Sequence, residues 1–450
     1  MSLISLRSAV LVLFLSLTLL RLPVRVRSLT LLVCSLLFFA VSPELLALHV
    51  LHTALTLVLA FLMRRFRPAR RPLLALGILA HCLAFVWLRG RGGFSYAALM
   101  HIGFLLDADL SSPTAGLQES AAALTWFPVL QEGPILDARR FAKQLSRPEP
   151  LSWERGSHAV LRIVAGLVKK LVVADRMAAF VAAAYSAPQT CSTGALWLAV
   201  LVYAIQIYMD FSGCMDVVLG VCALTGFDLP ENFRRPYLAD SCSEYWRRWH
   251  ITMGRWFRHR VFYPLAASLP MLKLAGRLDR AVRSPFGAGM AAAAPMLFTW
   301  TLVGLWHGFA PHYALWGILN GFLILMESFR LSIGSHWPKA ARIARTFLAL
   351  CLIRVLFRAD SLRSAGLFYV GLFRPQGGAL PLGAPLPGFL VAVFFALFFF
   401  ALELREERQG KPEIGVSAAL TLTALGIACV TIFGCYGPGY SPTEFFYNRF

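Results

Sequence analysis

The sequence predicts an all-α protein that crosses a membrane many times. Of its 450 residues, 58% are hydrophobic and only 15% are charged, and apolar stretches long enough to cross a bilayer recur along the chain. The 43 Lys and Arg residues, which contribute to a net charge of +20, lie mainly between these stretches. This distribution follows the positive-inside rule and forms no continuous patch with base-stacking motifs, so we expect membrane lipid and no nucleic acid as a partner.

The apolar stretches divide into ordinary spans and interrupted segments. Spans are expected at Ala9–Leu20, Leu29–Val41, Leu45–Met63, Leu73–Leu88, Ser157–Val173, Leu196–Met209, Ala291–Trp306, Tyr313–Met326, Thr346–Phe357, Gly388–Leu402 and Ser417–Phe433. Phe94–Leu106 is short and flanked by Gly, and Ala121–Leu136 contains Gly and Pro, so both are expected to be re-entrant or broken helices inside protein. We expect roughly ten to twelve crossings in a single domain, residues 1–450, because no internal repeat is visible.

The basic residues also predict an orientation. Arg21, Arg25 and Arg27 fill the first loop, and the third loop contains five arginines between Arg64 and Arg71, whereas the intervening loop at Ser42 and Pro43 has none. The first and third loops are therefore expected in the cytoplasm, with the N-terminus outside. No small-residue cleavage site follows Ala9–Leu20, so this segment is expected to be a retained span rather than a signal peptide.

Neither the cysteines nor the histidines suggest a metal site. The nine cysteines form no CxxC motif and lie mostly in apolar surroundings, which is typical of buried thiols that pack as small hydrophobic groups. His49 and His52 share a helix face, but Glu44 is the nearby carboxylate, so a metal site there is weakly supported. We expect no bound metal and no tightly bound cofactor.

The segment Tyr237–Leu265 is basic and aromatic and stands out from its apolar surroundings. On a helix at about 100° per residue, one face would carry Trp246, Trp249, Met253, Trp256 and Phe257, and the other Arg247, Arg248, Arg255 and Arg258. His250 would lie between the two faces. This pattern predicts an amphipathic helix in the membrane interface on its cytoplasmic side, and it fits a simple surface anchor equally well.

Ionisable residues within apolar stretches are the first functional candidates, because burying them is costly. His307 follows the span Ala291–Trp306 and precedes Gly308, which would let a substrate approach the backbone. A neutral imidazole in such a place can accept a proton near pH 7, although a histidine that hydrogen-bonds between helices is an equal alternative. His250 is the second candidate, and its alternative is a residue of the membrane interface.

Four other ionisable positions have simpler explanations. Asp210 is expected to cap a helix that ends near Gly213, although a buried carboxylate could also orient a histidine. Arg354 is expected to extend to the membrane surface, although it could instead pair with a buried acid. Lys169 and Lys170 are expected to be solvated at that surface, although they could instead meet an anionic donor.

Several motifs together resemble the membrane-bound O-acyltransferase family, and in particular its bacterial branch of alginate O-acetyltransferases and D-alanyl transfer proteins. The matching segments are Trp126-Phe127-Pro128 with Gly133-Pro134-Ile135, Gly166–Lys170 with Ala174-Asp175, Gln206–Gly213, Asn232–Tyr237, Ser243–Ile251, Leu305–Gly308 with Trp316-Gly317, and Phe357–Ser361. They follow the order of the family, and the family-like part covers about residues 94–370. The sequence departs from the pattern at His101, Glu132, Asp240 and Asn320.

The resemblance implies a ring of tilted helices with re-entrant and interfacial helices around a central funnel. His307 would be the catalytic histidine and His250 its companion, while Asn232, Arg247, Arg248, Trp249, Trp306 and Asp210 would bind substrate. The donor would be a thioester of coenzyme A or of an acyl carrier protein, reaching the protein from the cytoplasm and attracted by the arginines of the basic segment.

The expected function is therefore transfer of a short acyl group, acetyl first, to a hydroxyl of an extracytoplasmic polysaccharide or acyl-relay protein at a bacterial cytoplasmic (inner) membrane. D-alanyl transfer in teichoic acid modification and acylation of a lipid or small metabolite are the alternative reactions. A transporter is the alternative from another class, but intramembrane carboxylates are few and no repeat is visible. A catalytically inactive scaffold is a further alternative. The presence of both His250 and His307 within matching motifs argues against it.

Overall fold

The computed structural model describes residues 11–436 except positions 13, 17, 19–21, 90, 92, 109–115, 147–148, 283–284, 330, 332, 382 and 384. The described residues form helices, and pairing between extended segments is limited there to two isolated β-bridges. The predicted all-α fold is thus confirmed. The expected span Ala9–Leu20 lies only partly within the described residues.

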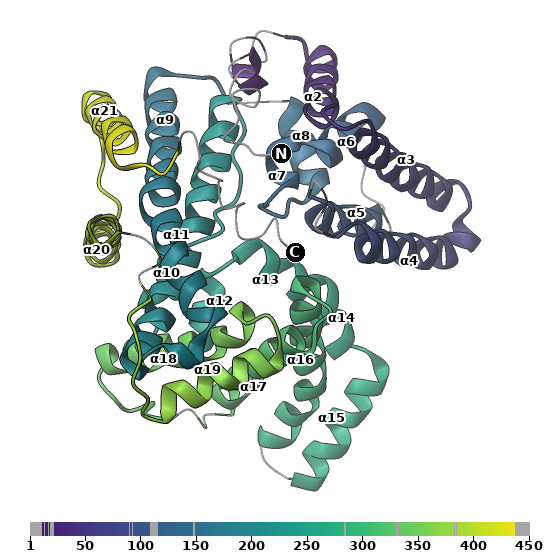
Figure 1. The fold of residues 1–450 in the computed structure, drawn as a ribbon. Coiled ribbons are helices and arrows are strands. Elements are labelled where there is room, and N and C mark those ends of the chain that lie inside the picture. Colours follow the sequence, from purple (N-terminus) through teal and green to yellow (C-terminus); the bar gives the residue numbers. More distant parts are fainter. Residues whose placement is uncertain are drawn as a thin grey trace.

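The N-terminal helices form one side of the molecule in Figure 1. They are α2 (Val24–Phe39), α3 (Pro43–Arg65), α4 (Arg70–Leu88), α5 (Phe94–Ala108), α6 (Leu117–Thr125), α7 (Phe127–Leu130) and α8 (Ala138–Ser146), with a short 3₁₀ turn at Arg67–Ala69. The expected interruption of Ala121–Leu136 is confirmed, because α6 and α7 are separate and the chain is irregular from Gly133 to Asp137. Almost all of α5 is buried, so this short apolar helix packs inside the protein.

The central helices are longer than expected. A π-helical segment, Val168–Ala174, joins α9 (Trp153–Leu167) to α10 (Asp175–Ser186), so the predicted span continues well beyond Val173. Helix α11 runs without a break from Thr193 to Leu224. The prediction that this helix closes at Asp210–Gly213, with Asp210 as a cap, is wrong: Asp210 lies in the middle of α11.

The C-terminal half adds the remaining helices. They are α12 (Cys242–Arg248), α13 (Ile251–Phe257), α14 (Tyr263–Ala266), α15 (Leu269–Val282), α16 (Pro285–His307), α17 (Pro311–Ser328), α18 (Lys339–Arg358), α19 (Leu362–Phe373), α20 (Leu386–Gln409) and α21 (Val416–Phe433), with a 3₁₀ turn at Pro236–Leu238 and a π-helical segment at Arg258–Phe262. Helices α15 and α19 were not expected. In Figure 1, α13 lies near the middle, with the N-terminal helices, α9–α11 and α16–α19 around it.

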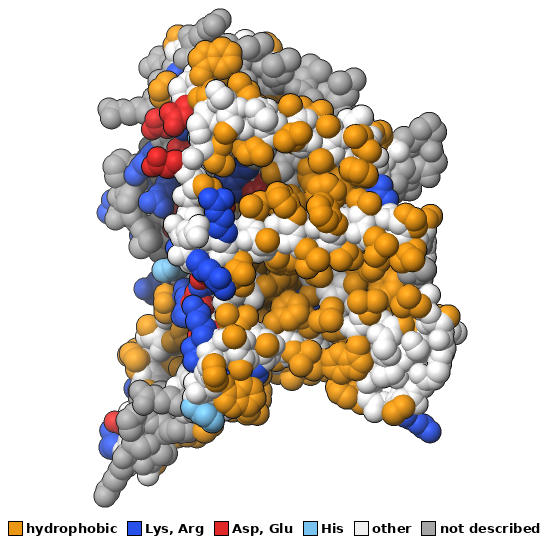
Figure 2. Space-filling view, turned by 90° about the vertical axis from the view of Figure 1, so that its left-hand side faces the viewer, with side chains coloured by type: hydrophobic (Ala, Val, Ile, Leu, Met, Phe, Trp, Pro, Cys, Tyr) orange, Lys and Arg blue, Asp and Glu red, His pale blue; other side chains and the backbone are white. Residues whose placement is uncertain are grey.

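The surface of the molecule fits a bilayer. Five helices of the described part are long and apolar enough to cross one: Pro43–Arg65, the segment Arg67–Leu88, Thr193–Leu224, Leu386–Gln409 and Val416–Phe433. Figure 2 shows a broad hydrophobic face on the side of α20 and α21, with Lys, Arg, Asp and Glu gathered along one edge. Such a wide apolar surface is unfavourable in water and favourable in lipid. The total number of crossings stays a prediction.

Two glycines bring α9 and α11 into direct backbone contact. A Cβ atom on Gly166 would lie 2.4 Å from the carbonyl oxygen of Gly213, and one on Gly213 would lie 2.8 Å from that of Gly166. No larger residue fits at either position without moving a helix. Small residues at such crossings are typical of membrane proteins, where close van der Waals packing drives helix association.

Buried ion pairs surround this crossing. The Nζ of Lys170 lies 2.7 Å from Oδ1 of Asp210 and 2.9 Å from Oδ1 of Asp175, and the three side chains are at most 6% exposed. Lys169 pairs with Asp216 at 2.7 Å. The expectation that both lysines are solvated at the membrane surface is therefore wrong. Each lysine pairs with a carboxylate of α11, because burying an unpaired charge is strongly unfavourable.

A cluster of histidines ties α3, α4 and α5 together. His52 Nε2 lies 2.6 Å from His81 Nδ1, and the hydroxyl of Thr56 lies 3.1 Å from His81 Nε2 and 2.6 Å from His101 Nδ1. His49 stacks between Phe39 and Phe94, with ring centroids 4.0 and 4.4 Å apart. These contacts account for His101 as a polar link between helices. No group of three or more His, Cys, Asp or Glu within the described ranges is arranged to hold a metal ion.

We predict that Lys170→Met lowers the free energy of unfolding by about 3–5 kcal/mol, because it leaves the carboxylates of Asp210 and Asp175 buried without their cation. Equilibrium unfolding in mixed detergent micelles measures this change. Arg247→Gln is the matched control: Arg247 pairs with Glu244 at 2.8 Å, but its side chain is 57% exposed, so its loss should cost at most about 1 kcal/mol. Equal costs for the two variants would contradict the account.

Candidate active site

The basic segment Tyr237–Leu265 is not the continuous helix that its pattern predicts. Helix α12 ends at Arg248, Trp249 is extended, and His250 adopts left-handed backbone angles, with φ of 46°, before α13 begins at Ile251. The predicted apolar face is nevertheless buried, since Trp246, Trp249, Met253 and Phe257 are each at most 7% exposed. The segment is thus built into the protein core and is more than a surface anchor.

Left-handed angles cost a residue other than glycine on the order of 1–3 kcal/mol, so the surrounding structure must hold His250 in place. The preceding loop does this by pairing with the segment: the amide of Arg234 donates to the carbonyl of Arg248, and the amide of Ile251 donates to that of Asn232. Phe233 and Trp249 form the corresponding β-bridge. His250 therefore lies at a sharp turn that extended backbone fixes from one side.

Asn232 fixes the side chain of His250 as well. Its Oδ1 accepts from the amide of Thr252 at 3.0 Å, from the hydroxyl of Thr252 at 2.9 Å, and lies 3.4 Å from Nδ1 of His250. A carbonyl oxygen accepts, so Nδ1 carries the proton in this arrangement and Nε2 is the acceptor nitrogen of a neutral ring. The Thr252 hydroxyl also accepts from the amide of Ile135 at 3.0 Å, which links the Gly133-Pro134 segment to the same centre.

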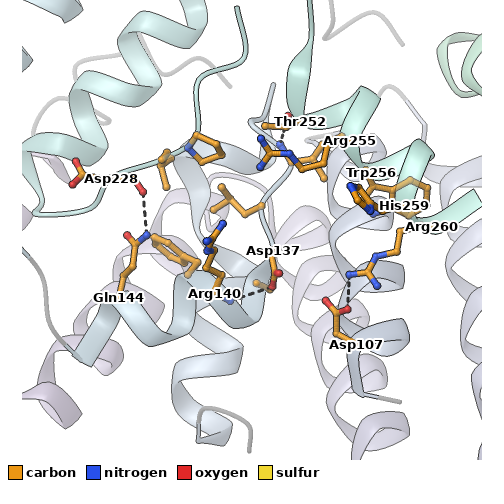
Figure 3. Close-up of a pocket in the computed structure, with 17 residues that line it drawn as sticks. Asp107, Asp137, Arg140, Gln144, Asp228, Thr252, Arg255, Trp256, His259 and Arg260 are labelled. Carbon is orange, nitrogen blue, oxygen red and sulfur yellow. Dashed lines mark hydrogen bonds and ion pairs between the residues drawn. The ribbon is translucent and has the colours of Figure 1, made fainter. Parts of the chain in front are cut away.

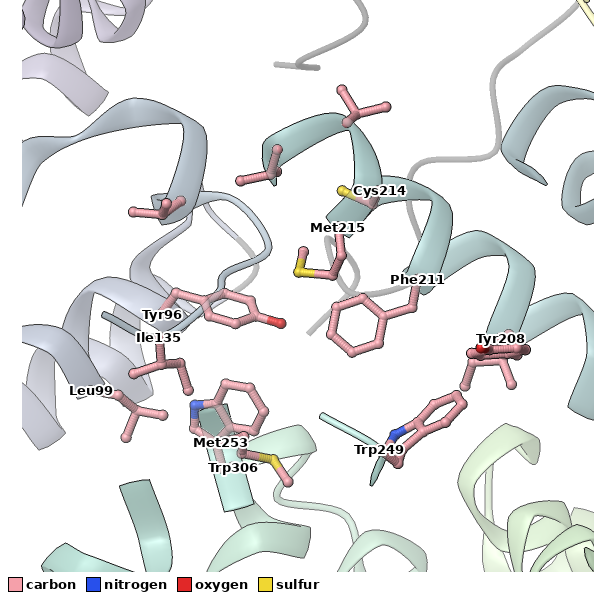
Figure 4. Packing of buried hydrophobic residues seen from close by; sticks show 14 of the residues in the cluster. Tyr96, Leu99, Ile135, Tyr208, Phe211, Cys214, Met215, Trp249, Met253 and Trp306 are labelled. Atoms are coloured by element: carbon pink, nitrogen blue, oxygen red, sulfur yellow. The ribbon is translucent and has the colours of Figure 1, made fainter. Parts of the chain in front are cut away.

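Aromatic rings enclose His250, which is fully buried. Its ring centroid lies 4.8 Å from that of Phe211 and 6.0 Å from that of Trp306. Figure 4 shows Phe211 and Met215 of α11 pointing toward Tyr96 of α5, with Trp306 next to them. The indole of Trp306 donates to the carbonyl of Ser95 at 3.3 Å, which fixes this ring against α5.

His307 lies on the other side of Trp306. The ring centroids of Trp306 and His307 are 4.7 Å apart, and Trp316 and Phe357 pack against His307 at 5.4 and 5.0 Å. His307 is only 2% exposed, and the ring of Trp306 lies close to both its imidazole and that of His250. The guanidinium of Arg89 donates to the backbone carbonyl of His307. The structure thus brings together the two histidines that the sequence singled out.

Arg354 supports the basic segment from α18. Its guanidinium donates to the hydroxyls of Tyr237 and Tyr245, lies 4.9 Å from the ring centroid of Trp249, and is only 6% exposed as a residue. The expectation that Arg354 extends to the membrane surface is therefore wrong. The aromatic rings satisfy its charge instead, and their positions depend on it.

The residues that depart from the resembled pattern also have definite contacts. Asn320 accepts from the indole of Trp246 at 3.1 Å, and Asp240 pairs with Arg342 at 2.7 Å. The hydrogen bond from Arg342 lowers the pKa of the Asp240 carboxyl below its ordinary value. Glu132 is buried. Asn320 and Asp240 therefore position other side chains.

A cavity of about 590 Å³ reaches this centre between α8 and α13 (Figure 3). We call it the α8–α13 cavity. Thr252, which bonds Asn232, belongs to its lining together with Gly103, Asp107, Ile135, Leu136, Asp137, Ala138, Arg140, Phe141, Gln144, Asp228, Leu229, Pro230, Arg255, Trp256, His259 and Arg260. Arg260 pairs with Asp107, and Asp228 pairs with Arg155. Arg255 and Arg140 form no ion pair with any residue that the structure describes.

A second cavity, of about 620 Å³, shares Arg255 and His259 with the first. We call it the arginine cavity, because six arginines line it against two glutamates: Arg234, Arg235, Arg247, Arg248, Arg255 and Arg258 against Glu244 and Glu407. Arg247 and Arg248, expected to bind substrate, are therefore placed at a strongly cationic opening. Asp210 was also expected to bind substrate. It forms an ion pair with Lys170 instead and lines neither cavity.

A third cavity, of about 400 Å³, adjoins His307. Its lining includes Arg89, at the end of α4. It also includes Gly308, which follows His307 in the sequence, and Phe357, whose ring packs against His307. Since α4 ends where α5 begins, this cavity and the α8–α13 cavity, lined by Gly103 and Asp107, lie at opposite ends of α5, about 20 Å apart along the helix. The histidine pair lies between them. We call this space the α16–α17 cavity.

We predict that Asn232→Leu speeds amide hydrogen exchange of Thr252 at least about tenfold, because it removes the acceptor shared by the Thr252 amide and hydroxyl. Hydrogen exchange of peptides spanning residues 248–256, read by mass spectrometry, measures this. Asn320→Leu is the control, since Asn320 bonds Trp246 and not Thr252. Unchanged exchange in Asn232→Leu would mean that Asn232 does not hold the turn.

The sequence is similar to those of known membrane-bound acyltransferases. The profile of the membrane-bound O-acyltransferase family matches residues 24–275, more than half of the chain. A probable alginate O-acetylase of Pseudomonas syringae pv. tomato is 31% identical over 334 residues, which are 71% of this chain and 60% of that protein. A peptidoglycan O-acetyltransferase of Helicobacter pylori is 27% identical, covering 54% of this chain and 44% of its own length.

A teichoic acid D-alanyltransferase of Bacillus subtilis is 25% identical, covering 58% of this chain and 66% of its own length. The chain spans between 53% and 65% of the lengths of the alginate O-acetylases that it matches. With apolar helices suited to a bilayer and a profile match over more than half its length, the chain belongs to the membrane-bound O-acyltransferase family.

Proposed function

We propose that this protein transfers a short acyl group from a cytoplasmic thioester to a hydroxyl group on the other side of a bacterial cytoplasmic membrane. One observation carries the proposal: two buried histidines lie between cavities at opposite ends of α5. Such an arrangement lets donor and acceptor approach the same catalytic group from the two sides without exchanging places.

The charge distribution supports the orientation. The arginine-rich turn between α3 and α4 lies at the same end as the α8–α13 cavity. Helices α4 and α5 follow each other through a short connection and pack together, so the start of α4 lies beside the end of α5, where Asp107 lines that cavity. By the positive-inside rule this end faces the cytoplasm. The α2–α3 turn and the α16–α17 cavity then face outside, as does the N-terminus in the predicted orientation.

The two cationic openings suit the donor. In coenzyme A or an acyl carrier protein, the thioester stands at the end of a long flexible arm attached to phosphate or to an acidic surface. The arginine cavity would hold the anionic part, and the α8–α13 cavity, which shares Arg255 and His259 with it, would guide the arm toward Thr252 and His250.

The chemistry assigned to His307 is general-base catalysis. Its neutral imidazole takes the proton of the acceptor hydroxyl as the hydroxyl oxygen attacks the thioester carbonyl carbon. The tetrahedral intermediate then expels the thiolate, which takes the proton back from the imidazolium. No cofactor is consumed. His250, held by Asn232, positions the reacting groups beside Trp306.

We propose acetyl as the acyl group and an extracytoplasmic polysaccharide, or a protein that relays the group to one, as the acceptor. The alginate and peptidoglycan O-acetylating relatives support acetyl, and the enclosure of both histidines by aromatic rings favours a small group. D-alanyl transfer is the second candidate, supported by the D-alanyltransferase relatives.

We predict that His307→Ala abolishes transfer, lowering it at least about 100-fold, because it removes the general base that accepts the hydroxyl proton. Membranes are supplied with radiolabelled acetyl-coenzyme A, and stable label is counted in polymer, protein and lipid fractions. His336→Ala, at an exposed histidine, is the control. Equal labelling by wild type and His307→Ala would refute the catalytic assignment. Labelling only from D-alanyl carrier protein would favour the second candidate.

We predict that Arg255→Gln raises the KM for acetyl-coenzyme A about tenfold and lowers kcat much less, because Arg255 lines both openings and forms no ion pair within the described part of the chain. The wild-type KM should rise with salt, and that of the variant should rise less. Lys339→Gln, at an exposed lysine outside these cavities, should leave both constants unchanged. A kcat effect with unchanged KM would contradict the donor path.

A further inference from the structure

The α16–α17 cavity has a chemical character of its own. It is lined by Arg89, Gly308, Phe309, Ala310, His312, Tyr313, Phe357, Arg358, Ala359 and Asp360. Two guanidiniums thus face one carboxylate, and that carboxylate is 86% exposed and lies 3.9 Å from Arg358. A pair so exposed and so long is weak, so the cavity keeps a net positive charge.

Two polar groups of this cavity have a nitrogen atom without a hydrogen-bond partner among the described residues. His312 is only 3% exposed, and its Nδ1 has no hydrogen-bond partner among the described residues. The Nε of Arg89 is buried and equally unpartnered in that part of the chain, although the same guanidinium donates to the carbonyl of His307. Buried polar atoms without partners are costly, and a bound ligand would satisfy them.

The start of α17 adds to the positive character. This helix of 18 residues begins at Pro311, and no side chain caps it at Ala310. Its first residues, His312 and Tyr313, line the cavity. Pro311 has no N–H and the amide of Tyr313 donates to the carbonyl of Ala310 at 3.1 Å, but the N-terminus of a helix still carries partial positive charge and favours anions. Three independent elements, α4, α17 and α18, therefore direct donors or positive charge into one space.

We propose that the α16–α17 cavity is a binding site for an oxyanion, a carboxylate or phosphate group, carried by the sugar unit whose hydroxyl is acylated. Arg358, the unpartnered Nδ1 of His312 and the start of α17 bind the oxyanion, and Arg89 joins this site to His307 through the His307 carbonyl. Phe309, Tyr313 and Phe357 offer flat apolar surfaces for the sugar ring. The site thereby selects an anionic acceptor and orients it. Identifying the bound sugar as the acceptor rests on the proposed function, whereas the binding of an oxyanion in this cavity does not.

The test is equilibrium binding to the purified full-length protein in detergent, with D-glucuronate, D-glucose 6-phosphate and D-glucose as probes. We expect the two anionic sugars to bind at least about tenfold more tightly than glucose, and to bind more weakly as salt rises. Arg358→Gln should remove this preference, and Arg358→Lys should keep part of it. Arg363→Gln, an exposed arginine near the start of α19 that does not line the cavity, should leave it intact.

Several outcomes would overturn the proposal. These are equal affinity for glucose and the anionic sugars, no binding of any probe, or full anion binding by an Arg358→Gln protein. Preference for an acidic peptide over both anionic sugars would assign the site to a protein acceptor instead. Thermal unfolding of each variant shows that it is folded. Because no acyl transfer is measured, failure of this proposal and failure of the proposed function remain distinguishable.

Discussion

The side-chain oxygen of Asn232 is the constraint on which the site depends. One atom accepts from the amide and hydroxyl of Thr252 and lies within hydrogen-bond distance of His250 Nδ1. It thereby holds a left-handed residue, begins α13, and connects the Gly133-Pro134 segment to the basic segment through Thr252. A hydrophobic or differently shaped side chain would leave these buried donors unsatisfied, and the imidazole would lose its fixed tautomer.

This local arrangement needs a rigid frame, which buried charges and close helix contacts provide. Gly166 and Gly213 let α9 and α11 touch, and Lys170, in the π-helical segment after α9, pairs with Asp210 of α11 and Asp175 of α10. Such ion pairs contribute little net stability compared with apolar packing, but breaking one partner is strongly unfavourable. They therefore fix the relative position of the helices. Phe211, one residue after Asp210, consequently meets His250 at 4.8 Å.

The fold class and most of the long helices could be predicted from the sequence, which also singled out His250 and His307 as candidates. Hydropathy identifies helices such as α3, α20 and α21, because lipid exposure requires apolar side chains along their whole length. Hydropathy does not identify features that depend on contacts between helices. Lys170, Asp210 and Arg354 look like surface or capping residues until their partners on distant helices are known. The break at His250 is also invisible to helical periodicity, because it depends on hydrogen bonds that Asn232 accepts from Ile251 and Thr252.

The anion site was missed for a related reason, although the sequence contains a signal for it. If the turn between α3 and α4 is cytoplasmic, Arg89 and Arg358 follow spans that end outside, where the positive-inside rule disfavours arginine. Arginines on the side that the rule disfavours indicate a specific role, such as ligand binding. Only the structure shows that both line one cavity next to His307.

The central claim is that cavities on the two sides of one histidine pair each take their own substrate. A structure of the protein with coenzyme A bound tests it most directly. We predict density for the nucleotide phosphates among the arginines of the arginine cavity, and the thiol arm in the α8–α13 cavity, ending near His250 and His307. Coenzyme A bound in the α16–α17 cavity, or with its thiol away from both histidines, would contradict the account.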